Sequence, residues 1–578
     1  MRLIELRANK ESFHTITFNE RGVSIIRATQ VSEDTKNTYN SIGKSLLVYL
    51  IHFCLGASTN EELKNKLPDW EFYLDFKIGD TLYTSTRNTE NQDNIWLNDI
   101  EFKVSEFNNH IQSLVFFNIP ENFKYISFRS LISRFIRPQK ASYNEYNKYI
   151  AKEKEYQQLI NNGFLLGLDI EKINKKRELK EQWDDIVKKK KNIENDPVMQ
   201  EFFTENTDRK KIDIEILHLE KRIEKLSTAI ENFKVAEDYD YIKQEADEIS
   251  SRLRDYKNRR TAIQNTIKNI DKNLDIKPDI KIKDIQKLYN EAKYEISDSI
   301  KKRLEDVEEF NKKLLGNRKA RLLEEKRAFE KQLSEIEGII RRLGKEEDQK
   351  LYLLKSTGSL EEYSKLNEQW TQLQNKYNKL KNYKELLESY NSKIDEIKEQ
   401  FLKENTDTNR YLKENELIKK RNIEVFNSFA DQFYQNKPSG ILIENNEGEN
   451  LNRFNIEATI DSDSGDAVNN VKIFCFDWTL LKNQNNHNVR FIFHDSRLIS
   501  EIDPRQIATM FYIAYSSTKK NDFQYIITTN QKELDSIKDI FSEDEYQKYI
   551  LDNVIEDLTD ESDEGKLLGI TVDLNYEK

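Results

Sequence analysis

The chain has 578 residues and a net charge of −11, and 34% of its residues are charged while 37% are apolar. An average soluble domain has about 25% charged and about 45–50% apolar residues, so the composition favours long solvated helices, whereas 30 Phe and 27 Tyr argue against a disordered chain. No apolar run reaches the about 18 residues of a membrane span, and the N-terminus lacks the apolar region of a signal peptide, so we expect a cytoplasmic protein. The absence of a C-x-x-C pair excludes a zinc knuckle. The negative net charge excludes a general attraction to nucleic acid.

The N-terminal segment, residues 1–140, combines short strand-like runs with a motif that is typical of phosphate binding. The run "GVSIIRA" predicts a buried strand, and "NTYNSIGKSLLVYLIHFCL" predicts a loop followed by an apolar helix. Gly43-Lys44-Ser45 matches the end of the P-loop pattern G-x-x-x-x-G-K-[ST], although Thr38 stands in the place of its first glycine. We expect ATP phosphates to bind Asn40, Ser41, Ile42, Gly43 and Lys44, and Mg²⁺ to bind Ser45. Alone, this short motif is equally typical of a surface loop.

Residues 141–435 carry the pattern of long coiled-coil arms. Apolar residues alternate in steps of four and three over residues 212–233, 329–343 and 363–397. Only Pro197 and Pro278 interrupt the interval 139–437, and proline is costly inside a helix. We expect an antiparallel hairpin with its apex near residues 270–285, in which the breaks around Pro197 and Gly358 lie at one height. A parallel coil between two chains is the alternative.

The C-terminal segment, residues 436–578, again predicts strands separated by helices. Its strand-like runs are "GILIE", "FNIEATI", "VRFIFHD" and "FQYIITTN". Neither terminal segment carries a complete site, so we expect the two to join as one α/β head with the coil inserted between them. The apolar strand that ends at Asp495 is typical of a Walker B carboxylate, which would be the second Mg²⁺ ligand. A strand that simply ends in an aspartate is the alternative.

The order of half-head, long coil and second half-head resembles the SMC/RecN/RecF-like ATPases. Several segments resemble more closely an uncharacterised bacterial group of SMC-like proteins, some of which belong to three-component, Lamassu-like anti-phage systems. These segments are "NTYNSIGKSLLVYLIHFCLG", "SFRSLISRFIRP", "LLGLD", "KKRLEDVEEFNKKLLGNR", "VKIFCFDWTLL" and "FHDSRLISEIDPRQIA".

This resemblance implies that the α/β head is of the ABC-type ATPase class and that ATP joins two heads into a homodimer. The first head would supply the P-loop and Asp495, and the second would supply Ser464, Gly465 and Asp466 from a signature-like helix start, although Ser-Gly-Asp is also a common helix cap. Asp503 and Asn530 would sense the γ-phosphate. The family usually has a glutamate directly after the Walker B aspartate to polarise water, but this chain has Ser496 there, so His494 and Glu501 are candidate substitutes.

The resemblance also implies DNA and protein partners. The helix "FRSLISRFIRPQK" offers Arg129, Arg134, Arg137 and Lys140 as phosphate contacts, and a solvated helix face is the plainer explanation. An adaptor and a toxic effector such as a nuclease would complete a defence system against phage or plasmids. Two other functions stay open, which are a RecN-like repair ATPase and a scaffold that binds nucleotide without hydrolysing it.

Overall fold

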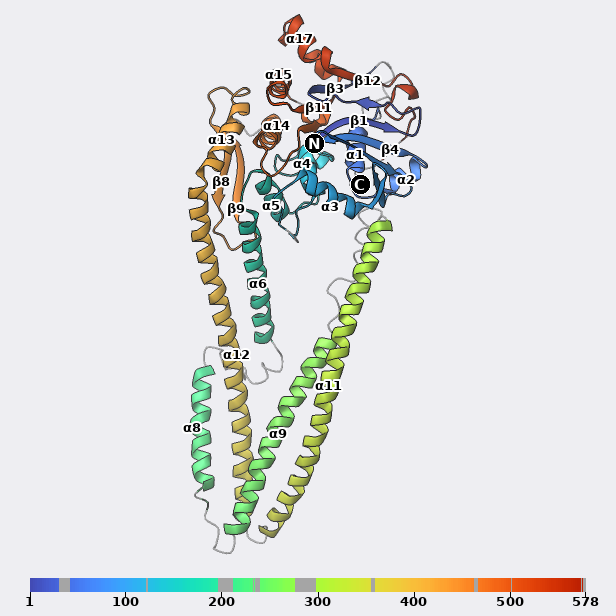
Figure 1. Ribbon diagram of the computed structural model, residues 1–578. Coiled ribbons are helices and arrows are strands. Elements are labelled where there is room, and N and C mark those ends of the chain that lie inside the picture. The colour runs from blue at the N-terminus through green and yellow to red at the C-terminus, as the bar shows by residue number, and fades with distance from the viewer. Residues whose placement is uncertain are drawn as a thin grey trace. The chain divides into compact units, whose positions relative to one another are not determined.

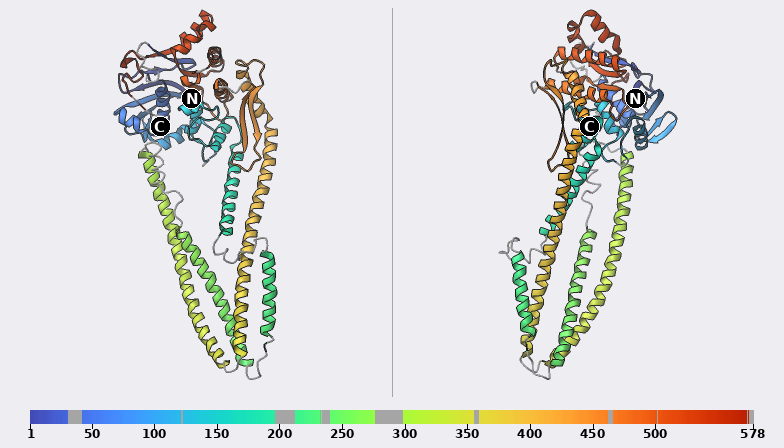
Figure 2. Two further views of the ribbon diagram at one scale, coloured as in Figure 1. Left: turned by 180° about the vertical axis from the view of Figure 1, so that it is seen from behind. Right: turned by 60° about the vertical axis from the view of Figure 1, so that its left-hand side comes forward.

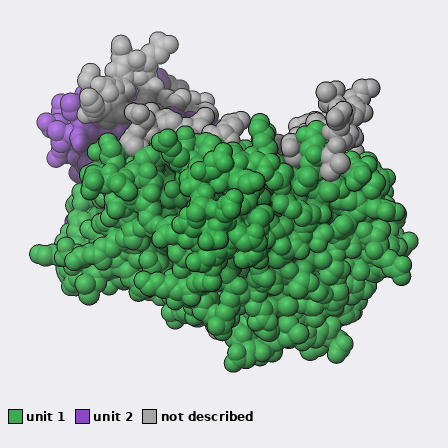
Figure 3. Space-filling view, turned by 90° about the horizontal axis from the view of Figure 1, so that it is seen from above, with its two compact units in different colours: residues 1–181, 285–303, 400–578 green, residues 182–284, 304–399 purple. Residues whose placement is uncertain are grey.

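The computed structural model describes residues 1–30, 42–120, 123–195, 212–231, 233, 240–275, 298–354, 359–461, 466–500, 502–572 and 574. The chain divides into two compact units (Figure 3). The first unit comprises Met1–Glu181, Ile285–Arg303 and Gln400–Lys578, and the second comprises Gln182–Asp284 and Leu304–Glu399. The first unit therefore extends past the expected boundary at residue 140 and resumes before residue 436, because the segments 141–181 and 400–435 pack in it and not in the arms.

An antiparallel sheet in the first unit is built entirely from the N-terminal segment (Figure 1). Its order is β2 (Ile16–Thr17), β1 (Arg2–Ala8), β4 (Glu71–Ile78), β5 (Thr81–Asn88), β6 (Asn94–Leu97) and β7 (Ile100–Lys103). Side chains alternate between the two faces of a strand, and accordingly Phe72, Leu74 and Phe76 of β4 are buried while their neighbours are half-buried. One face of this sheet therefore belongs to the core.

A second, parallel sheet mixes strands from both ends of the chain. Its order is β10 (Phe491–His494), β11 (Gln524–Asn530), β3 (Gly22–Thr29) and β12 (Val554–Thr559), and every neighbouring pair is parallel. Strand β3, from the N-terminal segment, thus lies between two C-terminal strands. This finding agrees with the expectation that the two terminal segments share one α/β unit. A separate two-stranded sheet is formed by β8 (Ser439–Asn445) and β9 (Phe454–Ile460).

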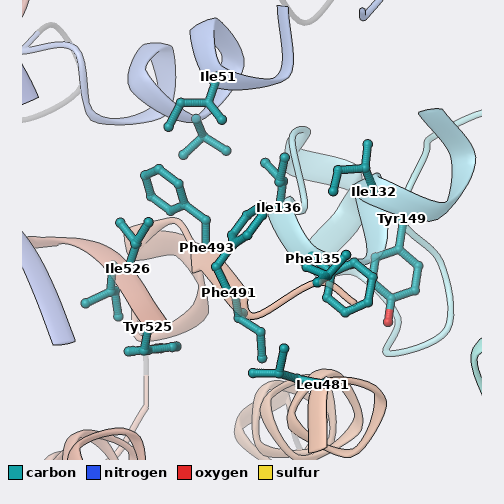
Figure 4. Close-up of a cluster of buried hydrophobic side chains, with 14 of the residues drawn as sticks. Ile51, Ile132, Phe135, Ile136, Tyr149, Leu481, Phe491, Phe493, Tyr525 and Ile526 are labelled. Atoms are coloured by element: carbon teal, nitrogen blue, oxygen red, sulfur yellow. The ribbon is translucent and has the colours of Figure 1, made fainter. Parts of the chain in front are cut away.

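Helices cover both faces of the parallel sheet, and β10, β11 and most of β3 are accordingly buried. On one face, Phe493 of β10 lies beside Ile51 of α1 (Lys44–Cys54), and α4 (Phe128–Ile136) packs beside it (Figure 4). On the opposite face lies α14 (Asp466–Asn483), whose Leu481 closes the cluster. The remaining helices of this unit are α2 (Glu61–Lys66), α3 (Val104–Val115), η2 (Lys140–Tyr143), α5 (Glu155–Leu165), α13 (Glu416–Ala430), η5 (Ser496–Leu498), α15 (Pro504–Asn521), α16 (Gln531–Ser536), η6 (Lys538–Ile540), α17 (Glu543–Tyr549), η7 (Leu551–Asn553) and η8 (Asp563–Gly565).

The second unit consists of long helices that run side by side (Figure 2). They are the outer part of α6 (Ile170–Glu194), α8 (Ile212–Glu231), α9 (Asp240–Asp275), α11 (Asp298–Leu354) and most of α12 (Ser359–Glu414). Helix α9 runs antiparallel to α11, and α8 runs antiparallel to α12, because in each pair the partners' numbers fall as the residue numbers rise. The contacts are Glu245–Lys350, Ser250–Glu347, Asp271–Lys326, Asp213–Lys384 and Glu220–Tyr377.

Helix α9 also lies parallel to α12 inside this unit. The Arg254 guanidinium stacks on Trp370 at 3.9 Å from the ring centroid, and Tyr363 donates a hydrogen bond to Asp247. The antiparallel contacts of α9 with α11 fit the expected arms, whereas its parallel contacts with α12 are not part of a single hairpin. The expected apex near residues 270–285, apart from the end of α9, and the breaks at Pro197 and Gly358 lie outside the described residues. None of the described helices is long and apolar enough to span a bilayer.

Candidate nucleotide-binding site

The candidate site lies where the parallel strands end at their carboxyl edge and helix α1 begins. Gly43 caps this helix with a φ of 108°, a conformation that L side chains rarely adopt. A Cβ atom on Gly43 would lie 2.5 Å from the Cβ of Leu567, and the Leu567 amide donates to the Ile42 carbonyl at 3.0 Å. The loop before the helix therefore requires glycine at position 43, and the C-terminal segment holds it in place.

Lys44 is the residue that connects the two ends of the chain at this site. Its side chain is buried, and its Nζ donates a hydrogen bond to Oδ1 of Asn530 at 2.6 Å. Burial lowers the pKa of Lys44 to about 8, while the charges of Asp495 and Glu533 act in the opposite direction and favour the ammonium form. The structure thus brings three sequence-predicted residues, Lys44, Asp495 and Asn530, into one place.

Asp495 reaches the same side of the sheet as α1 because side chains alternate along β10. Phe491 and Phe493 point toward α1 and α4 (Figure 4), and the next residue of this parity is Asp495. Its amide donates to the Tyr143 hydroxyl at 2.7 Å, and its Oδ1 accepts from the Arg497 amide at 3.0 Å. Its Oδ2 is buried and has no hydrogen-bond partner in the part of the chain that the structure describes.

The side chain of His494 points to the opposite face of the sheet from Asp495. It is therefore not placed to substitute for the usual glutamate, contrary to the prediction from the sequence. Its Nε2 lies 2.9 Å from Oδ2 of Asp477 in α14, and its Nδ1 lies 3.1 Å from the Tyr525 hydroxyl. Burial lowers the pKa of His494, although Asp477 opposes that change. Both ring nitrogens are engaged on the α14 face, away from Lys44.

Ser496 brings no carboxylate to the site. Its amide donates to Oγ1 of the buried Thr528 at 3.1 Å, and its hydroxyl lies 3.4 Å from Oδ1 of Asp495. Ser496 therefore helps to fix the turn after β10. The other proposed substitute, Glu501, lies outside the described residues.

Glu533 is a residue of this site that the sequence analysis missed. Nδ2 of Asn530 donates to its Oε1 at 3.0 Å, its charge acts on Lys44, and its Oε2 is buried with no hydrogen-bond partner among the described residues. A sequence signal for it existed, because a residue three positions after Asn530 lies in the first turn of the helix that follows β11. The site thus contains two carboxylates.

The other predicted nucleotide residues are placed as follows. Ser45 follows Lys44 in the first turn of α1 and is half-buried. Asp466 is the first residue of α14, and Asp503 caps α15 by accepting the Arg505 amide at 2.8 Å. Four residues lie outside the described ranges: Asn40, Ser41, Ser464 and Gly465.

Two of the four residues predicted to contact DNA are buried, which contradicts that prediction for them. Arg134 is fully buried and forms an ion pair with Glu153, and Arg137 is fully buried and donates to Oδ1 of Asp477 at 2.9 Å. Arg129 donates to the Ser58 hydroxyl at 2.8 Å, and Lys140 is exposed. A guanidinium already paired inside the core cannot neutralise a phosphate, so this helix does not present the predicted basic patch.

The donor set suits Mg²⁺ better than a transition metal. Asp495 offers a buried carboxylate oxygen without a hydrogen-bond partner among the described residues, and Mg²⁺ prefers oxygen ligands and is commonly held by one or two carboxylates plus substrate phosphates. Among the described residues, no group of three or more His, Cys, Asp or Glu side chains is arranged to hold a metal. The residues present therefore fit an ion that a phosphate would help to bind.

The chain is similar to two solved structures over nearly its whole length, and to one sequence family over its C-terminal segment. The crystal structure of the Smc head domain with a coiled coil and joint derived from Pyrococcus yayanosii is 14% identical, with a TM-score of 0.36, and the match covers 96% of this chain and 94% of that one. The crystal structure of the Smc head domain with an extended coiled coil bound to the C-terminal domain of ScpA derived from Pyrococcus furiosus is 12% identical, with a TM-score of 0.32, and the match covers 92% and 90%. No curated protein matches the chain. A family described as "Uncharacterised protein conserved in bacteria (DUF2326)" matches residues 429–572, the segment that supplies Asp495, Asn530 and Glu533 to the site.

Proposed function

We propose that the first unit binds ATP together with Mg²⁺ at the edge of its parallel sheet. The observation that carries this proposal is the meeting of Lys44 with Asn530 at 2.6 Å and with the charge of Asp495, from opposite ends of the chain. A lysine at the start of a helix, reached through a glycine with positive φ and facing a strand-end aspartate, is the arrangement that P-loop ATPases use for phosphates.

Each residue has a distinct part in this proposal. The helix start and Lys44 bind the phosphates, Asp495 and Ser45 hold Mg²⁺, and Asn530 lies beside the terminal phosphate. The ion neutralises charge on the phosphates when it is bound. Lys44 is half-deprotonated near pH 8 in the absence of ligand, because burial lowers its pKa to about 8, and the negative phosphates restore its proton on binding.

ATP binding then joins two copies of the chain through their heads, with Ser464, Gly465 and Asp466 of one copy facing the nucleotide of the other. This part of the proposal is supported by the sequence order of the motifs and by the start of α14 at Asp466. In this function the dimer clamps or senses DNA and controls a partner effector in defence against phage or plasmids.

Two measurements test the proposal. In sedimentation velocity with and without ATP and Mg²⁺, we expect ATP to convert the monomer to a dimer. In equilibrium binding of ATP, we expect Lys44→Ala to lower the affinity about tenfold or more, because a charge-assisted hydrogen bond contributes about 1.5–3 kcal/mol. The matched control is Lys520→Ala, which removes an exposed lysine of α15 in the same unit. Unchanged nucleotide binding by Lys44→Ala would contradict the proposed site.

One observation favours a second function, a scaffold that binds ATP without hydrolysing it. Ser496 stands in the position where the resemblance calls for a glutamate, and it offers no base. Phosphate release that equals that of Lys44→Ala, together with intact ATP binding, would support the scaffold.

A further inference from the structure

Hydrolysis at this site needs a group that accepts a proton from water, and the usual position does not provide one. Ser496 has a hydroxyl that is turned toward Asp495, and His494 is engaged on the α14 face. Asp495 itself is assigned to Mg²⁺ in the proposed function. Among the described residues, the other carboxylate whose charge acts on Lys44 is Glu533, which lies on a different element.

We propose that Glu533 is the general base for ATP hydrolysis in this protein, an inference that rests on the proposed ATP site. Lys44 Nζ, the Asn530 amide and the Glu533 carboxylate form a chain, with 2.6 Å from Lys44 to Asn530 and 3.0 Å from Asn530 to Glu533. A P-loop lysine contacts the β- and γ-phosphates, so this chain places Glu533 on the side of the terminal phosphate.

The carboxylate of Glu533 has one oxygen engaged and one available. Oε1 accepts from Nδ2 of Asn530, while Oε2 is buried and has no hydrogen-bond partner within the described part of the chain. A buried polar atom without a partner costs about 1–3 kcal/mol, which a hydrogen bond from a bound water would recover. In the candidate site, Oδ2 of Asp495 is likewise without a hydrogen-bond partner among the described residues, and the Asp495 side chain is only 3% exposed.

The position of Glu533 is fixed by its own short helix. Leu534, the next residue of α16, is fully buried, and its carbonyl accepts a hydrogen bond from the Tyr546 hydroxyl of α17 at 3.3 Å. The other carboxylate of α16, Asp535, is exposed and is bonded by Gln531. Only the first of these two acidic residues faces the candidate site.

The proposed step conserves all atoms and charges. The water oxygen forms a bond to the γ-phosphorus, and the bond between that phosphorus and the bridging oxygen of ADP breaks with its electron pair leaving on ADP. One water proton passes to Oε2 of Glu533 and is then released with the inorganic phosphate. Lys44 stabilises the charge that develops on the phosphates, and a bound Mg²⁺ held by Asp495 and Ser45 would supply further positive charge.

Two substitutions at position 533 separate a base from a structural support. Glu533→Gln keeps an oxygen that can accept from Asn530 but cannot take a proton, whereas Glu533→Ala removes both capacities. For Glu533→Gln we expect ATP binding as in the unmodified protein and phosphate release lower by about 100-fold or more, since general bases contribute about 10²–10⁴ in rate. Asp535→Asn on the same helix is the matched control and should hydrolyse ATP normally.

A readout that does not depend on turnover accompanies the rate. After incubation with ATP and Mg²⁺ and gel filtration, the nucleotide retained by Glu533→Gln should be ATP, and its ATP-induced dimer should persist. Normal hydrolysis by Glu533→Gln with impaired Glu533→Ala would show that Glu533 only supports Asn530 and would overturn the inference. Loss of ATP binding in Glu533→Gln, or an unmodified protein that binds ATP but releases no more phosphate than Lys44→Ala, would also overturn it. Neither outcome would contradict the proposed ATP site, which fails if the unmodified protein does not bind ATP or if Lys44→Ala binds it normally.

Discussion

Single residues show which parts of the site the sequence could predict. Lys44, Asp495 and Asn530 each follow a clear strand pattern, and the carboxyl ends of parallel strands meet at one edge, so their convergence was predictable. Glu533 was missed because it belongs to a short polar helix without a motif of its own. The charge of Arg134 and Arg137 and their positions around the apolar face of a predicted helix favour DNA contact, and only the three-dimensional partners Glu153 and Asp477 reveal that both are core residues.

Asp477 is the centre of a buried network that joins α14 to strand β10 and to the segment after α4. Arg137 and His494 bond its carboxylate, and the Tyr149 hydroxyl donates to it at 2.6 Å. Burial alone would raise the pKa of Asp477, but the charge of Arg137 and the bonds from His494 and Arg137 outweigh burial and lower it. The carboxylate is therefore ionised at neutral pH.

We predict that Asp477→Asn destabilises the first unit by about 3–5 kcal/mol, because removing one charge leaves Arg137 buried without its counter-ion. The double variant Asp477→Asn with Arg137→Met should lose less than the sum of the two single variants, since neither buried charge then remains. Urea denaturation followed by tryptophan fluorescence measures both quantities. Additive losses would mean that the pair contributes no coupling.

At the scale of elements, the heptad patterns correctly marked helices but could not select their partners. The apolar run 212–233 covers α8, and the runs 329–343 and 363–397 lie inside α11 and α12. A heptad seam shows that a helix has a partner, and it does not say which helix that is. The antiparallel contacts of α9 with α11 fit the predicted arms, but its parallel contacts with α12 could not be predicted from the seam alone.

The antiparallel pairing of α9 and α11 leads to a cross-linking prediction. We expect Ser250→Cys combined with Glu347→Cys to be joined within one chain by a short bismaleimide, because these side chains are hydrogen-bonded to each other. Ser250→Cys with Glu337→Cys is the control, since a shift of ten residues moves the second site about 15 Å along the helix. The native Cys54 and Cys475 are buried, so they should not react. Cross-linked dimers on a denaturing gel would instead indicate the parallel coil between chains.

At the scale of the whole molecule, the first unit is one fold made from two distant stretches of sequence. Strand β3 pairs with β11 on one side and with β12 on the other, and the Met1 carbonyl accepts from the Arg490 amide at 2.8 Å. Composition and strand patterns predicted that the two ends join. They did not predict that α5 and α13 belong to the same unit, because their apolar faces look like those of coiled-coil helices.

This interleaving predicts that residues 1–181 and 400–578 associate when they are produced as separate chains. Co-expression with a tag on one fragment should recover both as a 1:1 complex on gel filtration, because β3 has both of its neighbours in the other fragment. Each fragment produced alone should aggregate or remain poorly folded by circular dichroism. A well-folded, monomeric N-terminal fragment would contradict the prediction.

The central position of β3 has a consequence for biosynthesis. The ribosome completes β3 and the lysine-bearing helix early, but their neighbours β11 and β12 emerge only after the coil and the rest of the head have been translated. Until then the nascent chain lacks both carboxylates and the asparagine of the proposed catalytic centre. Under the proposed function, a chain whose synthesis stops before Asn530 lacks part of the site, so nucleotide turnover requires translation past Glu533.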